Sequence, residues 1–325
     1  MVICIDRNKL LGKGSYGMVY EAIDSTTKTK YAAKIVDRDD AYIVRESLLH
    51  SKLNHPNIVK LHDAYKLNGN GAWVLILDKI DGETLYDYAD HFLGRSIPIS
   101  MAVNYLHQIA SALNYCNNND IIHRDVKPEN IILDQNTGQC KLIDFGFCFH
   151  KADVPATTAG TSYFMPPETI HINKINNKND NYKNSLLQAE SIDVWSFGVM
   201  MHEILTGLNP FNVNEDCTFE QVMHKISCAD FEIHHSIQNL DARNLIKSIL
   251  VKDPLKRPTW SRILKSPFFN KICLDNQRLE KKEKRLDQEK KCRLKTSKIN
   301  GMVLSLASTR WIKRFKKVVM AQSTL

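Results

Sequence analysis

The chain has 325 residues, of which 43% are hydrophobic, and a formal net charge of +8; this is enough apolar sequence to fill the cores of two lobes. Its 8 cysteines are scattered, with no CxxC pair and no histidine cluster at the spacing of metal ligands. This argues against a zinc site or a disulfide framework and favours a reducing compartment, the cytoplasm or alternatively the nucleus. No run reaches the roughly 18 apolar residues of a membrane span, so no transmembrane segment is expected, and the start MVICIDRN lacks the features of a signal peptide.

The first motif is glycine-rich, GKGSYG, and lies between two apolar, strand-like runs at 9–11 and 18–20. Gly12, Gly14 and Gly17 allow the backbone to approach phosphate groups closely. Dinucleotide-binding folds use a similar motif, but there a helix follows it. Because the strand-like sequence MVYEAI follows here, the motif is more typical of a hairpin that covers nucleotide phosphates.

An apolar strand is predicted at Tyr31–Val36, and it carries a single charge, Lys34. The segment 39–53 has the pattern of a helix, in which Glu46 is the expected ion-pair partner of Lys34. Two simpler interpretations stay open: Lys34 as a charge on a strand edge, and Glu46 on a solvated helix face.

Four polar side chains then occur at fixed offsets in two loops. The loop His123–Asn130 reads HRDVKPEN and supplies Asp125, Lys127 and Asn130, while Asp144 opens the tripeptide DFG after a short apolar run. Phosphoryl transfer needs a site that holds Mg²⁺, screens phosphate charge and orients the attacking hydroxyl. An amide and a carboxylate suit Mg²⁺, and a further carboxylate can accept the hydroxyl proton.

In this order and at this spacing the motifs resemble those of the eukaryotic protein kinases of the serine/threonine type; a chance pair of tripeptides is the alternative. The resemblance implies an α+β, bilobal kinase fold over residues 5–269. It implies a small β-rich lobe at about 1–77 and a larger helical lobe at about 82–269, with ATP between them and the hinge near 77–80.

The resemblance also assigns roles to single residues. Asp125 is the implied catalytic base, Lys127 neutralises the γ-phosphate, and Asn130 and Asp144 hold Mg²⁺. The residues implied to bind ATP are Leu11, Gly12, Gly14, Gly17, Val19, Ala32, Lys34, Glu83 and Ile132.

The segment 144–168 resembles a kinase activation segment. Arg124 could bind a phosphate placed on Thr157 or Thr158, and Thr157 is the preferred switch because of its distance from Gly160. Thr161 resembles the threonine that contacts the catalytic loop in serine/threonine kinases. The segment ends in Pro-Pro-Glu, as in some relatives of the calmodulin-dependent, Pim and Aurora groups, of which the calmodulin-dependent group is the first choice.

Three further residues are implied to support the large lobe or to depart from the family pattern. In SIDVWSFGV, Asp193 resembles the anchor of the catalytic-loop backbone, and Arg257 resembles the buried partner of Glu168. His50 departs from the family, because similar kinases place an aliphatic side chain there against the ring that matches Phe145. The helix that carries His50 could therefore dock less firmly without phosphorylation or a partner.

Two regions lie outside the kinase pattern. Residues 170–190 are rich in Asn and Lys and are predicted to form a surface loop. Residues 270–325 hold 16 Lys and Arg against 5 Asp and Glu, so the basic character belongs to this tail and no nucleic-acid role is expected for the core.

Within the tail, a basic amphipathic helix is predicted at about 308–321, with Trp311 and Phe315 on its apolar face. Such a helix can bind calmodulin or inhibit its own kinase, contact a membrane or nucleic acid, or serve as a plain interaction tail.

The sequence therefore predicts a kinase that phosphorylates protein substrates on Ser or Thr. Glu83 and Glu129 match positions that bind an arginine three residues before the target hydroxyl in basophilic kinases; for Glu83, a ribose contact is the alternative. The competing function is a kinase-shaped scaffold with weak catalysis that binds partners through its basic tail. The presence of Lys34, Asp125, Asn130 and Asp144 favours the enzyme.

Overall fold

The computed structural model describes residues 2–14, 17–37, 40–67, 71–153, 160–171, 183–214, 216–228 and 231–270. The chain divides into two units, Met1–Phe269 and Asn270–Leu325, and the architecture below is that of the first. Thr157, Thr158, most of the predicted insert and the predicted helix at 308–321 lie outside the described residues.

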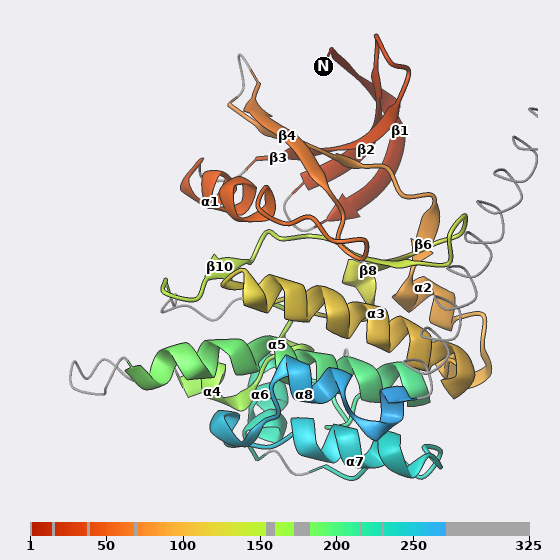
Figure 1. Cartoon of the computed structure of the whole chain (residues 1–325), viewed down its shortest axis with the longest axis vertical. Helices are drawn as coiled ribbons and strands as arrows, with labels where there is room; N and C mark the ends of the chain where they lie inside the picture. The colour runs from red at the N-terminus through yellow and green to blue at the C-terminus, as the bar shows by residue number, and fades with distance from the viewer. Residues whose placement is uncertain are drawn as a thin grey trace, which may run out of the picture. The chain divides into compact units, whose positions relative to one another are not determined.

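A five-stranded antiparallel sheet with one helix forms the small lobe (Figure 1). Its spatial order is β1-β2-β3-β5-β4. The elements are β1 (Ile3–Gly14), β2 (Gly17–Asp24), β3 (Lys30–Val36), α1 (Asp40–His50), β4 (Leu61–Lys66) and β5 (Trp73–Asp78).

Two apolar clusters of the small lobe lie among the residues that the structure describes. Ala22, Ala33, Val74 and Ile76 form one buried cluster of the sheet. Val36 and Leu75 form the other with Ile43 of α1. Side chains alternate between the two faces of a strand, so Lys34 shares the face of Val36 on β3. Ile43 packs α1 against Val36, which brings this helix beside Lys34.

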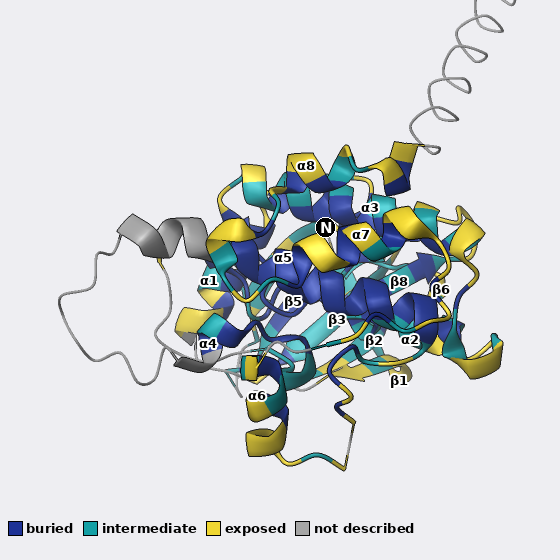
Figure 2. Ribbon diagram, turned by 90° about the horizontal axis from the view of Figure 1, so that it is seen from below, coloured by how far each residue is buried: buried dark blue, intermediate teal, exposed yellow. Residues whose placement is uncertain are grey.

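The large lobe is built mainly of helices packed around α3 and α5, and Figure 2 shows α5 buried along much of its length. Short strands and 3₁₀ turns lie between these helices along the chain. The elements are β6 (Gly82–Thr84), α2 (Leu85–Ala89), η1 (Leu93–Arg95), α3 (Ile99–Asn118), β7 (Ile121–Ile122), η2 (Pro128–Asn130), β8 (Ile131–Asp134), β9 (Cys140–Leu142), β10 (Phe149–His150), η3 (Ser162–Phe164), α4 (Pro167–His171), α5 (Lys183–Thr206), α6 (Phe219–Cys228), α7 (Leu240–Ile249), η5 (Pro254–Lys256) and α8 (Trp260–Leu264).

A buried ion pair joins three parts of this lobe, as the sequence predicts. Arg257 donates from both terminal nitrogens to the two carboxylate oxygens of Glu168, at 2.6 and 2.7 Å. Its guanidinium also lies 4.7 Å from the ring centre of Trp195 on α5. The fork geometry and the ring stacking both require arginine rather than lysine.

The predicted loop at 170–190 is wrong over its last third, because α5 begins at Lys183. Ala189 is buried against Ile122, Phe149 and Ile192, so tertiary packing extends the helix back into the Asn/Lys-rich segment. The predicted helix 39–53 is also shorter than expected and spans Asp40–His50.

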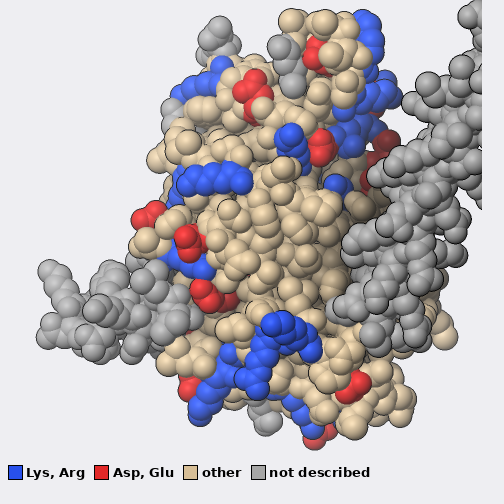
Figure 3. All heavy atoms as spheres, in the orientation of Figure 1, with Lys and Arg blue, Asp and Glu red and all other residues tan. Residues whose placement is uncertain are grey.

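The described residues bear on membrane insertion and on surface charge. None of their helices is both long enough and apolar enough to cross a membrane. On the face in Figure 3, basic and acidic side chains are interspersed, which agrees with the absence of a basic excess in residues 1–269 of the sequence.

Candidate active site

A cavity of about 840 Å³ lies between the lobes and gathers the residues that the motifs predict. It is lined by the catalytic and metal-binding candidates Glu46, Asp125, Lys127, Asn130 and Asp144 and by the hinge segment 77–81. The predicted ATP-binding residues that line it are Leu11, Gly12, Gly14, Gly17, Val19, Ala32, Lys34 and Ile132. Glu83 is not among the lining residues, and its carboxylate lies 3.2 Å from Nε2 of His91.

Lys34 joins the two lobes through its ammonium group. Its Nζ donates to Asp144 Oδ1 at 2.7 Å and to Glu46 Oε1 at 3.4 Å. Burial alone would lower the pKa of Lys34, but the two carboxylates raise it above its usual value. Burial alone would likewise raise the pKa of Asp144, yet the charge of Lys34 holds it below its usual value. These shifts favour the charged forms of Lys34 and Asp144. Because Lys34 and Glu46 pair in a largely buried contact, the simpler interpretations of both as surface charges do not apply.

The catalytic loop is anchored to the buried helix α5 by Asp193, as predicted. The Asp193 carboxylate accepts hydrogen bonds from the backbone N–H groups of His123 at 2.7 Å and Arg124 at 2.8 Å. Arg124 has a positive φ of 70°, a conformation that a non-glycine residue keeps only when its surroundings hold it. The anchor therefore fixes the turn that presents Asp125.

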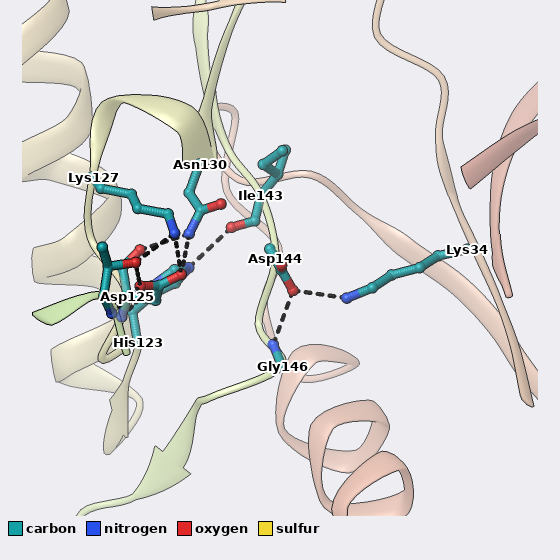
Figure 4. A network of polar contacts seen from close by, with 9 residues as sticks. Lys34, His123, Asp125, Lys127, Asn130, Ile143, Asp144 and Gly146 are labelled. Atoms are coloured by element: carbon teal, nitrogen blue, oxygen red, sulfur yellow. Dashed lines mark hydrogen bonds and ion pairs between the residues drawn. The ribbon is translucent and has the colours of Figure 1, made fainter. Parts of the chain in front are cut away.

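Asp125 is the centre of a hydrogen-bond network that Figure 4 shows in part. Its Oδ2 accepts from the amide of Asn130 at 2.7 Å and lies 3.1 Å from Nζ of Lys127. Its Oδ1 accepts from the backbone N–H and the hydroxyl of Thr161, at 2.9 and 2.8 Å. Lys127 also donates to the Thr161 hydroxyl at 2.5 Å, so the predicted contact of Thr161 with the catalytic loop is present.

The residues present fit a magnesium nucleotide. Asn130 uses its nitrogen to bond Asp125, so its amide oxygen points away from that carboxylate (Figure 4). This oxygen and the Asp144 carboxylate are the two hard ligands expected for Mg²⁺. An ion bound by these two ligands would take its remaining ligands from phosphate and water. Mg²⁺–ATP would supply the phosphoryl group and neutralise its charge there.

The three motif glycines differ in their surroundings. A Cβ at Gly12 would meet nothing within 4 Å, and one at Gly14 would only touch Gly17 O at 3.9 Å. A Cβ at Gly17 would lie 2.0 Å from the backbone oxygen of Ile35 on β3. The first two glycines therefore leave room above the cavity, whereas Gly17 is required by the packing of the sheet itself.

Two neighbouring glutamates, Glu129 and Glu203, form an acidic pair near the catalytic loop. The sequence predicted a role only for Glu129. Glu129 lines the cavity, its Oε2 is buried without a hydrogen-bond partner among the described residues, and burial raises its pKa. Glu203 on α5 was missed; burial and the charge of Glu129 raise its pKa to about 7, while Arg95 acts in the opposite direction. The available signal was a single carboxylate in the apolar run WSFGVMMHEIL.

Gly160→Ala tests the junction between Thr161 and the catalytic loop. Gly160 has φ +108°, and a Cβ there would lie 2.5 Å from the carbonyl oxygen of Arg124. Gly138 has φ +68°, and a Cβ there would meet no atom within 4 Å, so it is the matched control with backbone strain but no clash. We expect Gly138→Ala to cost about 1 kcal/mol of unfolding free energy and Gly160→Ala at least about 2 kcal/mol. Urea unfolding of both variants measures this, and equal costs would contradict the assigned clash.

Comparison with known proteins places the chain in a family. A family model described as "Protein kinase domain" matches residues 5–269. A Saccharomyces cerevisiae protein named "Putative serine/threonine-protein kinase YPL150W" is 34% identical over 82% of this chain and 28% of its own length. Calcium-dependent protein kinase 5 of Plasmodium falciparum is 32% identical over 84% of this chain and 46% of its own length.

A third relative, Aurora/IPL1-related protein kinase 2 of Caenorhabditis elegans, is 30% identical over 84% of this chain and 85% of its own length. The chain thus spans less than half of the first two relatives and most of the third. Together with the bilobal fold and the arrangement of Lys34, Asp125, Asn130 and Asp144, these matches show that the chain belongs to the protein kinase family.

Proposed function

We propose that this protein is a serine/threonine protein kinase that transfers the γ-phosphate of ATP to hydroxyl groups of proteins. The observation that supports it best is the network around Asp125, in which Lys127, Asn130 and Thr161 orient both carboxylate oxygens in the wall of the cavity. A scaffold without catalysis would not need these contacts together with the Lys34–Glu46 ion pair.

Asp125→Ala is the direct test of this activity. Loss of the base should lower kcat for peptide phosphorylation by about 10²- to 10⁴-fold, while the Kd for Mg²⁺–ATP changes little because Lys34 and Asp144 remain. Asp63, an exposed carboxylate on β4, gives the control Asp63→Ala, which should keep full turnover. Unchanged turnover in Asp125→Ala would refute the proposed mechanism.

The proposed substrates carry an arginine three residues before the target Ser or Thr. Glu129 supports this preference, because its Oε2, which has no hydrogen-bond partner within the described part of the chain, would gain one in an incoming guanidinium. The neighbouring Glu203, whose pKa burial and the charge of Glu129 raise to about 7, would be favoured in its charged form by the same guanidinium.

We expect Glu129→Gln to lower kcat/KM for an Arg-x-x-Ser peptide by about tenfold or more and to affect an Ala-x-x-Ser peptide little. Glu83→Gln, which alters the carboxylate beside His91, provides the comparison between the two candidate residues. A peptide array on the unmodified chain that favours proline-directed or acidic sites would exclude the preference altogether.

Activation by phosphorylation of Thr157 is part of the proposal. Arg124 supports it, since burial lowers the pKa of its guanidinium only to about 10, which leaves the group charged and able to bind phosphate at neutral pH. We expect Thr157→Ala to lower kcat by about 5- to 150-fold, whereas Thr158→Ala keeps activity. The same loss in both variants, or in neither, would contradict this choice of site.

The tail is proposed to regulate the kinase through the basic amphipathic segment at 308–321, by binding calmodulin or the kinase itself. The name of the calcium-dependent relative from Plasmodium falciparum and the pattern Trp311, Phe315, Met320 support the calmodulin form. A peptide of residues 300–325 should shift its tryptophan emission to the blue when calcium-loaded calmodulin is added. No shift would exclude calmodulin, and an unchanged rate after deletion of 270–325 would exclude self-inhibition.

A further inference from the structure

A second cavity, the α7–α8 groove, lies in the large lobe and is separate from the nucleotide site. It has a volume of about 710 Å³ and is lined by residues of α7, η5 and α8 and of the turns beside them. This volume falls in the range of ligand pockets. Of the described residues, none lines both this groove and the nucleotide cavity, so a molecule bound here would leave the active site accessible.

Part of the groove is a single face of α7. Asp241, Asn244, Leu245 and Ser248 line it, and their i, i+3, i+4, i+7 spacing places them on one side of a helix. Leu245 is 6% exposed and gives this face an apolar base. The Ser248 hydroxyl donates to the carbonyl oxygen of Leu245 at 2.7 Å, so its oxygen can still accept. This face is therefore partly apolar and partly hydrogen-bonding.

Three basic residues line the same groove. They are Lys256 of η5, Arg262 of α8 and Lys265 at the end of α8, whereas Asp241 is the one acidic residue among the described residues that line it. Figure 3 shows basic side chains gathered over α8 in the lower part of the large lobe. Because residues 1–269 have no basic excess as a whole, the positive charge is a local property of this groove.

These positive charges have little compensation within the described part of the chain. The side chains of Arg262 and Lys265 make no hydrogen bond or ion pair there, and Lys256 contacts only Asp253, at 3.7 Å. Ser266, which also lines the groove, has a buried hydroxyl without a hydrogen-bond partner among the same residues. Buried polar groups are rarely left unsatisfied. The groove therefore has both positive charge and a hydrogen-bond donor available for a bound anion.

The groove combines features that suit a carboxylate-rich peptide. The planar guanidinium of Arg262 can bind a carboxylate through two parallel hydrogen bonds, and the lysine ammonium groups favour further negative charge. Leu245, Pro258 and Pro267 supply apolar surface in the same groove, on which apolar side chains of a peptide would be buried. A small inorganic anion would leave this apolar surface uncovered, and a flat membrane surface would not fill a concave groove.

We propose that the α7–α8 groove docks an acidic segment of a partner protein, with its carboxylates at Arg262 and Lys265. This site goes beyond the proposed kinase activity. Its charge is opposite to that of Glu129, which is proposed to bind an arginine of the substrate, so one peptide segment does not suit both sites. A partner bound in the groove would hold the kinase near a protein without occupying the position of the target hydroxyl.

A peptide-binding experiment on the full-length chain tests this proposal. A fluorescein-labelled peptide Glu-Glu-Leu-Glu-Glu-Leu is titrated with the protein in the absence of nucleotide, and its fluorescence anisotropy gives the Kd. The double variant Arg262→Glu/Lys265→Glu reverses two charges of the groove and should raise the Kd about fivefold or more. The control Lys52→Glu/Lys60→Glu makes the same change of net charge at two exposed lysines outside the groove and should stay within about twofold of the unmodified chain.

The matched control is needed because the basic tail at 270–325 would also attract an acidic peptide. An equal Kd in the two double variants would mean that only net charge matters, and would overturn the proposal. So would equally tight binding of the uncharged peptide Gln-Gln-Leu-Gln-Gln-Leu. Vesicles that contain phosphatidylserine test for a membrane site: if their binding depends on Arg262 and Lys265 and that of the peptide does not, the groove is not a peptide site.

This readout is independent of turnover and so separates the docking groove from the proposed function. A chain that binds the peptide through Arg262 and Lys265 but phosphorylates no protein would refute the proposed function and leave the groove standing. An active kinase whose peptide binding is insensitive to these two charges would overturn the groove alone.

Discussion

The active-site architecture depends on one buried carboxylate. Asp193 leaves the core helix α5 and binds two consecutive backbone N–H groups, those of His123 and Arg124. These bonds hold Arg124 at a positive φ, and the next residue, Asp125, is presented to the cavity as a result. Asn130 and Thr161 then bind Asp125. The position of the whole polar network therefore depends on Asp193, a residue of a core helix that lies behind the catalytic loop.

The second constraint is electrostatic and connects the two lobes. Lys34 belongs to the small lobe, whereas Asp144 belongs to a loop of the large lobe, and their side chains meet at 2.7 Å. Burial alone would shift the pKa of each group toward its neutral form, and the opposite charge of the other group acts against that shift. Charge at the site is thus a property of the closed arrangement of lobes rather than of single residues, which makes the position of α1, the carrier of Glu46, important for activity.

The sequence predicted the residues whose chemistry is written in short motifs, including Asp125, Lys127, Asn130 and Asp144, because their spacing along the chain sets their spacing in space. It could not predict contacts that depend on packing between distant segments. The start of α5 at Lys183 depends on burial of Ala189, and the raised pKa of Glu203 depends on its burial and on the charge of Glu129. Glu83 was assigned to ATP, yet its carboxylate lies beside His91. His50 was recognised as unusual, but its hydrogen bond to the carbonyl oxygen of Val59 required the fold.

The unequal surroundings of the three loop glycines bear on how such sequences diverge. Room above Gly12 and Gly14 is useful only if a ligand enters, whereas Gly17 is held by the close approach of β2 to β3 whether or not one does. A descendant of this chain that lost its ligand could drift freely at the first two positions and would still have to keep the third. Retention of that last glycine alone is therefore poor proof that a distant homologue remains an enzyme.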